Sequence, residues 1–145
     1  MQSTVPEGFI EVVVGVVNDS DGRFLVTRRP WSKAYGGKWE FPGGKIEFGE
    51  TAWQALVREF CEELGLVVRE GQSLFDLRHI YPDRRVVLDV WQITRFERAA
   101  RPLEGQEIRW VSLDKLDELD FLDGNRELLT RLRAHYVSLF LADGR

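Results

Sequence analysis

The sequence predicts an α/β fold of the α+β type, in which a mixed β-sheet is sandwiched between α-helices. Two segments have the apolar spacing of amphipathic helices, and several shorter segments rich in valine or aromatic residues are bounded by turn residues. Strands and helices do not alternate regularly along the chain, which argues against a wholly parallel sheet. Because the chain has 145 residues, we expect residues 1–145 to form a single domain.

The N-terminal third is expected to consist of strands and one long loop. Residues 9–17 are rich in valine and predict a buried strand, and residues 24–27 follow a polar turn as its hairpin partner. Residues 28–38 contain proline and glycine and predict a loop. A short strand at 39–41 is expected to stop at the Pro-Gly-Gly sequence 42–44.

Residues 51–64 predict the clearest helix of the chain. Thr51 can cap the first turn, and Gln54, three residues later, completes a capping box. Gly65 suits the left-handed residue that commonly follows a helix. The helix is therefore expected to have defined ends on both sides.

The remaining half predicts more strands and a final helix. Strands are expected at 74–81 and 85–96, on either side of a Pro-Asp turn, and a further strand is expected at 108–111. Residues 125–141 have the apolar spacing of an amphipathic helix.

Composition restricts the class of partner. The formal net charge is −4, which argues against binding of duplex nucleic acid but leaves nucleotides open. The single cysteine, Cys61, excludes an intrachain disulfide and is typical of a reducing compartment. We see no signal peptide, and the longest apolar run, 12–17, is far shorter than the ~20 residues of a membrane span. A cytoplasmic enzyme that binds no membrane is expected.

The helix at 51–64 carries three carboxylates on one face. At about 100° per residue, Glu59, Glu62 and Glu63 lie together, beside an apolar face suited to the core. Their mutual repulsion, and the helix dipole at the last turn, would be offset by a bound cation, and carboxylate oxygens favour Mg²⁺ or Mn²⁺. The alternative is a solvated acidic face on which Arg58 pairs with Glu62.

The surrounding spacing distinguishes these two interpretations. Gly44 is followed by five residues, Glu50, seven residues and then Arg58-Glu59-Phe60-Cys61-Glu62-Glu63-Leu64-Gly65-Leu66. Residues 44–66 thus resemble the Nudix box, Gly-x5-Glu-x7-Arg-Glu-U-x-Glu-Glu-x-Gly-U, in which U is a bulky aliphatic residue. Phe60 departs from the pattern at one U position, where it still supplies a large apolar side chain.

The resemblance implies the Nudix fold and hydrolysis of a diphosphate linkage, with Mg²⁺ as cofactor and Mn²⁺ as a substitute. It implies that the metal is bound by one backbone carbonyl and three carboxylates, those of Gly44, Glu59, Glu62 and Glu63. Arg58 would orient the acids, because its guanidinium fork can hold a carboxylate bidentately.

Two glutamates are candidates for the general base. Glu59 is the first, as both metal ligand and proton acceptor. Glu104, outside the box, is a second candidate for both roles, and the alternative is an ordinary loop glutamate.

The flanks resemble the MutT branch of the family, which hydrolyses oxidised guanine nucleotides. The similarity includes residues 27–29, 38–47, 81–84 and 104–106. It implies substrate binding by five residues, namely Arg29 and Arg84 at the phosphates, Glu40 and Phe41 at the purine pocket, and Asn125 as the reader of the base. The structural alternatives are solvated arginines, a core aromatic at Phe41 and a helix N-cap at Asn125.

Two segments depart from MutT. The loop at 28–38 carries Trp31, Ala34 and Tyr35, where MutT proteins can offer a histidine that helps to close on the nucleotide, and residues 122–124 replace a Pro-Pro-Ala turn.

The expected function is metal-dependent hydrolysis of a nucleoside triphosphate to the monophosphate and pyrophosphate. The expected substrate is 8-oxo-dGTP or a related oxidised purine nucleotide, so that the enzyme would sanitise the nucleotide pool. The alternatives are a pyrimidine nucleotide pyrophosphohydrolase of the CTP or dCTP type, an RNA 5′-pyrophosphohydrolase and a non-catalytic nucleotide-binding module. A monomer or homodimer is expected.

Overall fold

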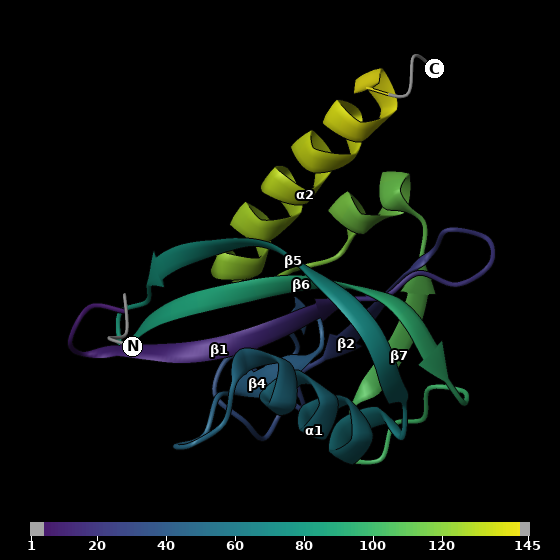
Figure 1. Cartoon of the computed structure of the whole chain (residues 1–145). Helices are drawn as coiled ribbons and strands as arrows, with labels where there is room; N and C mark the ends of the chain where they lie inside the picture. The colour runs from purple at the N-terminus through teal and green to yellow at the C-terminus, as the bar shows by residue number, and fades with distance from the viewer. Residues whose placement is uncertain (1–4, 143–145) are drawn as a thin grey trace.

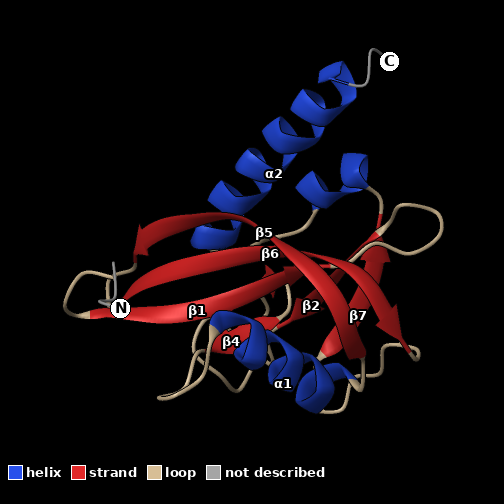
Figure 2. Cartoon of the chain, in the orientation of Figure 1, coloured by secondary structure: helices blue, strands red, loops and turns tan. Residues whose placement is uncertain are grey.

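Two α-helices and a 3-10 helix pack with two β-sheets in the computed structural model, which describes residues 5–142 (Figures 1 and 2). The strands are β1 (Phe9–Val16), β2 (Phe24–Arg28), β3 (Trp39–Glu40), β4 (Gly43–Lys45), β5 (Val67–Ile80), β6 (Arg85–Glu97) and β7 (Glu107–Val111). The helices are α1 (Ala52–Leu64), a 3-10 helix at Leu113–Glu118, and α2 (Asp123–Ala142).

The larger sheet is mixed and has the order β4-β1-β6-β5. Its central pair, β1 and β6, is parallel, and the two outer pairs are antiparallel. A smaller antiparallel sheet has the order β3-β2-β7. Helices α1 and α2 lie on opposite sides of the larger sheet (Figure 1). These observations confirm the mixed sheet between helices, although the strands form two sheets.

The expected hairpin between the first two strands is wrong. β1 pairs with β4 and β6, so both of its edges are occupied, and β2 instead pairs with β3 and β7. A single bridge between Asn18 and Phe24 is what links the two segments locally. Here long-range pairing overrides the local turn signal.

Two strand boundaries also differ from the sequence prediction. Residues 43–45 form β4 against β1 rather than a strand stop, and a Cβ at Gly43 would collide with the carbonyl oxygen of Val13. Glycine therefore permits the close pairing of the two backbones. β5 begins at Val67, well before residue 74, and three register irregularities between Val68 and Phe75 interrupt its alternation.

Helix α1 has the predicted ends. The Thr51 hydroxyl accepts a hydrogen bond from the Gln54 backbone N–H at 3.1 Å, and the Gln54 side chain accepts one from the Thr51 N–H at 2.9 Å. Gly65 follows the helix with φ +66° and donates to the carbonyl of Cys61. The capping box and the left-handed terminating residue are confirmed.

Helix α2 begins at Asp123, two residues before the predicted start. The Arg126 N–H donates to the Leu122 carbonyl at 3.0 Å, so helical hydrogen bonding begins ahead of Asn125. The N-cap interpretation of Asn125 is therefore wrong. Its side chain is 5% exposed and faces the interior.

The core has two parts, one on each side of the larger sheet. Strand alternation directs Val14 and Val16 of β1 to the α2 side, and Val13 to the α1 side. On the α1 side, Leu56 and Phe60 of the predicted apolar face are fully buried. This packing fixes α1 and its acidic face relative to the sheet.

Candidate active site

A pocket of about 370 Å³ opens between the two sheets, within the volume range of small-molecule sites. Part of its wall is apolar, and comes from β1 and β6 of the larger sheet. β1 contributes Ile10, Val12 and Val14, while β6 contributes Val86 and Leu88. The parallel register pairs Ile10 with Val86 and Val12 with Leu88, so these side chains form adjoining rows on one sheet face.

The acidic part of the site is organised by Arg58 of α1. Its Nε and Nη2 donate to the two carboxylate oxygens of Glu50 at 2.7 and 2.9 Å. These hydrogen bonds lower the pKa of the Glu50 carboxyl to about 2. Nη1 donates to Glu59 at 2.8 Å, and Nη2 also donates to the Lys45 carbonyl at 3.0 Å. Arg58 thus joins the acidic helix to β4 and to the loop before α1.

Gly44 of β4 lies directly against the carboxylate of Glu59. A Cβ at Gly44 would lie 2.5 and 2.6 Å from the two carboxylate oxygens, closer than real Cβ atoms approach such atoms. The Glu59 side chain is 15% exposed. The absence of a side chain at Gly44 is therefore what allows this carboxylate to sit beside the backbone of β4.

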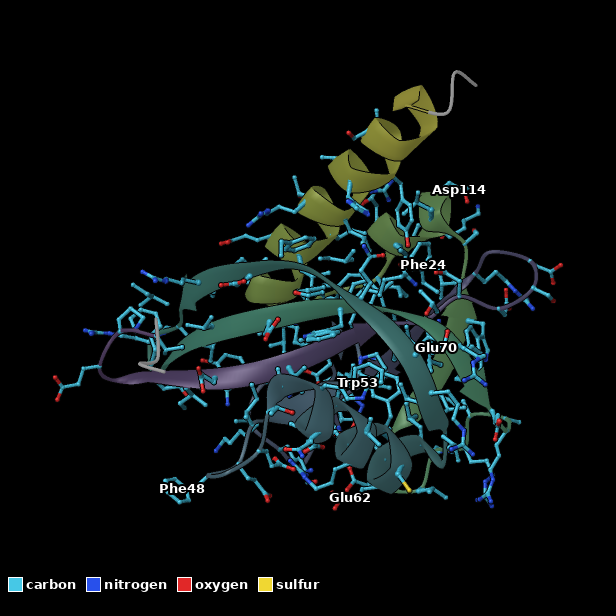
Figure 3. All side chains as sticks on the ribbon, in the orientation of Figure 1. Phe24, Phe48, Trp53, Glu62, Glu70 and Asp114 are labelled. Atoms are coloured by element: carbon cyan, nitrogen blue, oxygen red, sulfur yellow. The ribbon has the colours of Figure 1, made fainter. Side chains whose placement is uncertain are left out.

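Glu62 occupies a more open position than the other two acids of the helix. Its side chain is 56% exposed, points away from the sheet and accepts a hydrogen bond from Arg58 at 3.3 Å (Figure 3). In the part of the chain that the structure describes, no three acidic, histidine or cysteine side chains are arranged to hold a metal ion. Arg58 donates hydrogen bonds to both Glu59 and Glu62, so these two carboxylates meet at its guanidinium.

Glu63 faces the pocket and is surrounded by other acids. Burial, together with the charge and hydrogen bonding of Glu59 and the charges of Glu104 and Glu40, raises the pKa of the Glu63 carboxyl far above its usual range. Four carboxyl groups from three separate segments therefore converge on one region. Such convergence disfavours full ionisation unless a cation is present.

The loop that carries Glu104 is fastened to the end of α1. The Gln106 amide donates to the Glu63 carbonyl at 3.0 Å and accepts from the Glu104 backbone N–H at 2.9 Å. Leu103 N–H donates to the same Glu63 carbonyl at 3.1 Å. These bonds place Glu104 and Gln106 in the pocket wall beside Glu63.

Asn125 and Phe41 lie together in the pocket wall. The Oδ1 atom of Asn125 accepts a buried hydrogen bond from the Phe41 backbone N–H at 2.9 Å. The Phe41 ring is 3% exposed and stacks on Phe121, with centroids 5.6 Å apart. Phe41 is therefore a core aromatic that also lines the pocket.

Arg29 and Glu40 form a partly buried ion pair in the pocket wall. The Arg29 Nη1 lies 3.4 Å from Glu40, and its Nε donates to the Ala34 carbonyl at 2.8 Å. Burial raises the pKa of the Glu40 carboxyl, although the positive charge of Arg29 opposes this shift. Arg29 is consequently held by the protein and is not a freely solvated cation.

Arg84 also lines the pocket, but it is held by aromatic rings. Its guanidinium carbon lies 5.3 Å from the Tyr35 ring centroid and 5.5 Å from that of Tyr81. Both distances are within the range of cation–π contacts.

The comparisons with known proteins agree with this geometry. Residues 13–131 match the family described as the NUDIX domain. The chain belongs to the Nudix family. It is a Nudix hydrolase, and hydrolases of this family generally need a divalent metal ion.

The relatives of this Nudix hydrolase include enzymes of two substrate classes. The chain is 36% identical over 124 residues to the 8-oxo-dGTP diphosphatase of Escherichia coli (strain K12), covering 86% of this chain and 96% of that protein. It is also 36% identical over 103 residues to the CTP pyrophosphohydrolase of the same organism, covering 71% of this chain and 76% of that protein.

Solved structures show the same fold. The MutT structure from work on Aliivibrio salmonicida and Vibrio cholerae is 35% identical with a TM-score of 0.75, covering 87% of this chain and 98% of that one. The MutT Nudix hydrolase of Burkholderia pseudomallei is 27% identical with a TM-score of 0.77, covering 86% and 98%.

The donor atoms of the Nudix box suit a hard divalent cation. Gly44 presents backbone beside the Glu59 carboxylate, and Glu63 belongs to a cluster of acids whose ionisation is disfavoured in the absence of positive charge. Oxygen ligands of this kind bind Mg²⁺ or Mn²⁺. The residues present therefore fit the metal requirement of the family.

The structure separates the predicted site residues into two groups. Eight of them line the pocket, namely Arg29, Glu40, Phe41, Gly44, Glu63, Arg84, Glu104 and Asn125. Three others, Arg58, Glu59 and Glu62, lie behind or beside its wall rather than in it.

Sequence reasoning missed the lysines and the apolar wall of the pocket. Lys33 and Lys45 line it, as do the alternate residues of β1. The valine-rich sequence of β1 indicated a buried strand but not which of its residues face the pocket, and isolated lysines carry no signal of their position.

No described helix is long and apolar enough to cross a membrane.

Proposed function

We propose that this Nudix hydrolase converts 8-oxo-dGTP, or a related oxidised purine nucleoside triphosphate, to the monophosphate and pyrophosphate, and thereby sanitises the nucleotide pool. The observation that carries the proposal is the buried amide of Asn125 in the pocket wall. The 8-oxo-dGTP diphosphatase relatives support the same substrate class.

The amide orientation suits the edge of an oxidised guanine. Because Oδ1 accepts from the Phe41 N–H, the network assigns the other amide atom of Asn125 as the Nδ2 donor. Nδ2 can donate to the guanine O6, and the second lone pair of Oδ1 can accept from an N7–H. Guanine lacks that N7–H and 8-oxoguanine has it, so the same amide would favour the oxidised base.

The proposed chemistry uses the acids of α1 and the 101–106 loop. The proposed donors for Mg²⁺, which Mn²⁺ could replace, are the Gly44 carbonyl and the carboxylates of Glu59, Glu62 and Glu63, with Glu104 close by. When bound, the metal neutralises charge on the phosphate oxygens and lowers the pKa of a water molecule.

Hydrolysis needs a base for the attacking water and a bond that breaks to release the leaving group. Glu59 would accept the proton of the attacking water, and Glu104 is the alternative base. A new P–O bond forms from the water oxygen, and the bridging P–O bond between the α- and β-phosphates breaks to release pyrophosphate. Arg29 and Arg84, both in the pocket wall, would neutralise the phosphates.

Replacing Asn125 with alanine is expected to reduce the preference for 8-oxo-dGTP over dGTP by about 10- to 100-fold, the discrimination of one or two lost polar contacts. Asn125→Ala should leave the Mg²⁺ dependence of turnover unchanged, because the acids lie on other elements. The measurement is the ratio of kcat/KM for the two nucleotides. Asn18→Ala, which removes an amide that bonds to Gln92 away from the pocket, is the matched control. Unchanged selectivity in Asn125→Ala would remove this residue from the base site.

A second candidate function is hydrolysis of CTP, favoured by the CTP pyrophosphohydrolase relative. Purified protein with Mg²⁺ should be assayed with 8-oxo-dGTP, dGTP, CTP, 5-methyl-dCTP and a 5′-triphosphorylated RNA, with the released phosphates identified. The proposal requires the highest kcat/KM on 8-oxo-dGTP. A profile led by CTP or 5-methyl-dCTP would establish the second candidate instead.

The site residues, a single domain over residues 1–145, a cytoplasmic location and a monomeric or homodimeric state also stay predictions.

A further inference from the structure

Arg84 forms a cluster of four residues with Tyr35, Tyr81 and Asp83 at one side of the pocket. The rings of Tyr35 and Tyr81 lie 5.3 Å apart at an interplanar angle of 53°. The Arg84 guanidinium contacts both rings, as described above. The fourth residue, Asp83, precedes Arg84 in the turn between β5 and β6.

Tyr35 connects two segments that are far apart in the sequence. Its hydroxyl donates a short hydrogen bond of 2.5 Å to Oδ1 of Asp83, which lies 48 residues away. Tyr35 belongs to the 29–38 loop, whereas Asp83 belongs to the β5–β6 turn. The hydrogen bond therefore ties that loop to the turn that carries Arg84.

The backbone of Tyr35 adopts a conformation that few residues take. Its φ is +59°, in the left-handed region that disfavours side chains with a Cβ. Such conformations persist where surrounding contacts hold them. The contacts with Asp83, Arg84 and Tyr81 are the interactions that hold the Tyr35 side chain in this position.

Arg84 itself has few polar restraints. Its Nε is buried and has no hydrogen-bond partner among the residues that the structure describes. Asp83 accepts from Tyr35, and the guanidinium of Arg84 makes cation–π contacts with the two rings. Its direction in the pocket therefore depends on where those rings are placed.

We propose that Tyr35 is a positioning residue for substrate binding, which acts by holding Arg84 in the pocket through its ring and its hydroxyl tie to Asp83. Tyr35 is absent from the pocket lining, whereas Arg84 and Tyr81 are part of it, so Tyr35 acts through Arg84 and not on the substrate. The inference rests on the proposed function, because it takes Arg84 as a substrate contact.

Tyr35→Phe keeps the ring and removes the hydroxyl, so it tests the tie alone. With 8-oxo-dGTP, KM should rise about tenfold, corresponding to one lost charge-assisted hydrogen bond, while kcat stays within about twofold. A purely structural role would lower the melting temperature without this split between KM and kcat. An unchanged KM in Tyr35→Phe would overturn the proposal.

Coupling between the two side chains tests whether Tyr35 acts through Arg84. In an Arg84→Lys background the planar guanidinium is lost, and Tyr35→Phe should then change KM by less than about twofold. If Tyr35→Phe changed KM by the same factor in the parent and in the Arg84→Lys background, the proposal would be overturned. Tyr136→Phe is the control, because it removes a hydroxyl of α2 that donates to Gln92 of β6, and neither residue lines the pocket.

A titration separates failure of this inference from failure of the proposed function. The hydrogen bond to Asp83 and burial raise the pKa of the Tyr35 phenol, with Arg84 opposing and Tyr81 adding to the shift. Asp83→Ala should therefore lower this pKa, as followed by NMR of labelled tyrosine rings and assigned with Tyr35→Phe. If the parent protein hydrolyses no nucleotide, the proposed function fails. In that case a Tyr35 pKa that falls in Asp83→Ala supports the tie, and an unchanged pKa overturns it.

Discussion

Replacing Glu59 with glutamine is expected to lower kcat by about a thousandfold, the usual contribution of a general base, while leaving the fold intact. Glutamine has the shape of glutamate but neither its charge nor its basicity. The Glu59 carboxylate lies against Gly44 and accepts from Arg58, so the substitution removes charge at the meeting point of α1 and β4. Arg58 would retain its two bonds to Glu50, which preserves the link to the preceding loop.

The measurement is kcat on 8-oxo-dGTP with saturating Mg²⁺, alongside a thermal unfolding curve. Glu70→Gln is the matched control, because Glu70 is an exposed glutamate that pairs with Arg95 on the far strands of the sheet. The control should keep full turnover. Near-normal turnover in Glu59→Gln would exclude Glu59 as ligand and base, and Glu104 would then be the residue to replace.

Replacing Glu63 with glutamine is expected to stabilise the metal-free protein above neutral pH and to inactivate the enzyme. The pKa of the Glu63 carboxyl is raised by burial and by the acids around it. The folded protein thus binds a proton that the unfolded chain releases above its own pKa of ~4.3. The stability that this proton contributes is fully present below the pKa of the unfolded chain. It is lost as the pH rises through the pKa of Glu63 in the folded protein.

The test is the free energy of unfolding in chelator, by urea denaturation, at pH 5.5 and pH 8.5. Between these two pH values, the free energy of unfolding should change more in the parent than in Glu63→Gln, by on the order of 2 kcal/mol. At pH 8.5, added Mg²⁺ should raise the free energy of unfolding of the parent more than that of the variant. Glu118→Gln, at an exposed acid of the 3-10 helix that pairs with Lys115, should behave as the parent. Identical pH dependence in Glu63→Gln and the parent would show that this carboxyl is not held protonated by the fold.

The sequence was most informative where the interactions are local. The ends of α1 depend on Thr51, Gln54 and Gly65, which act within one turn of the helix, and all three behave as predicted. Strand pairing depends on distant partners, which explains the wrong hairpin between β1 and β2. The strand at Gly43 was missed because its signal is the close approach of another backbone, and no local pattern reports that.

The same distinction applies to the site. The acids of α1 could be located because their spacing along a helix and the spacing of the Nudix box coincide. The surroundings of Arg84 could not be predicted, since Tyr35 meets Asp83 across 48 positions and neither belongs to a spaced motif. Asn125 was placed in the site by resemblance, and its bond to the Phe41 backbone emerged only from the fold.

The most direct test of the central claim is the competition between 8-oxo-dGTP and dGTP in one reaction with Mg²⁺, followed by separation of the monophosphates and assay of released pyrophosphate. The account predicts that 8-oxo-dGMP and pyrophosphate accumulate first, with kcat/KM favouring the oxidised nucleotide by two or more orders of magnitude. Equal consumption of the two nucleotides, or release of inorganic phosphate in place of pyrophosphate, would contradict it.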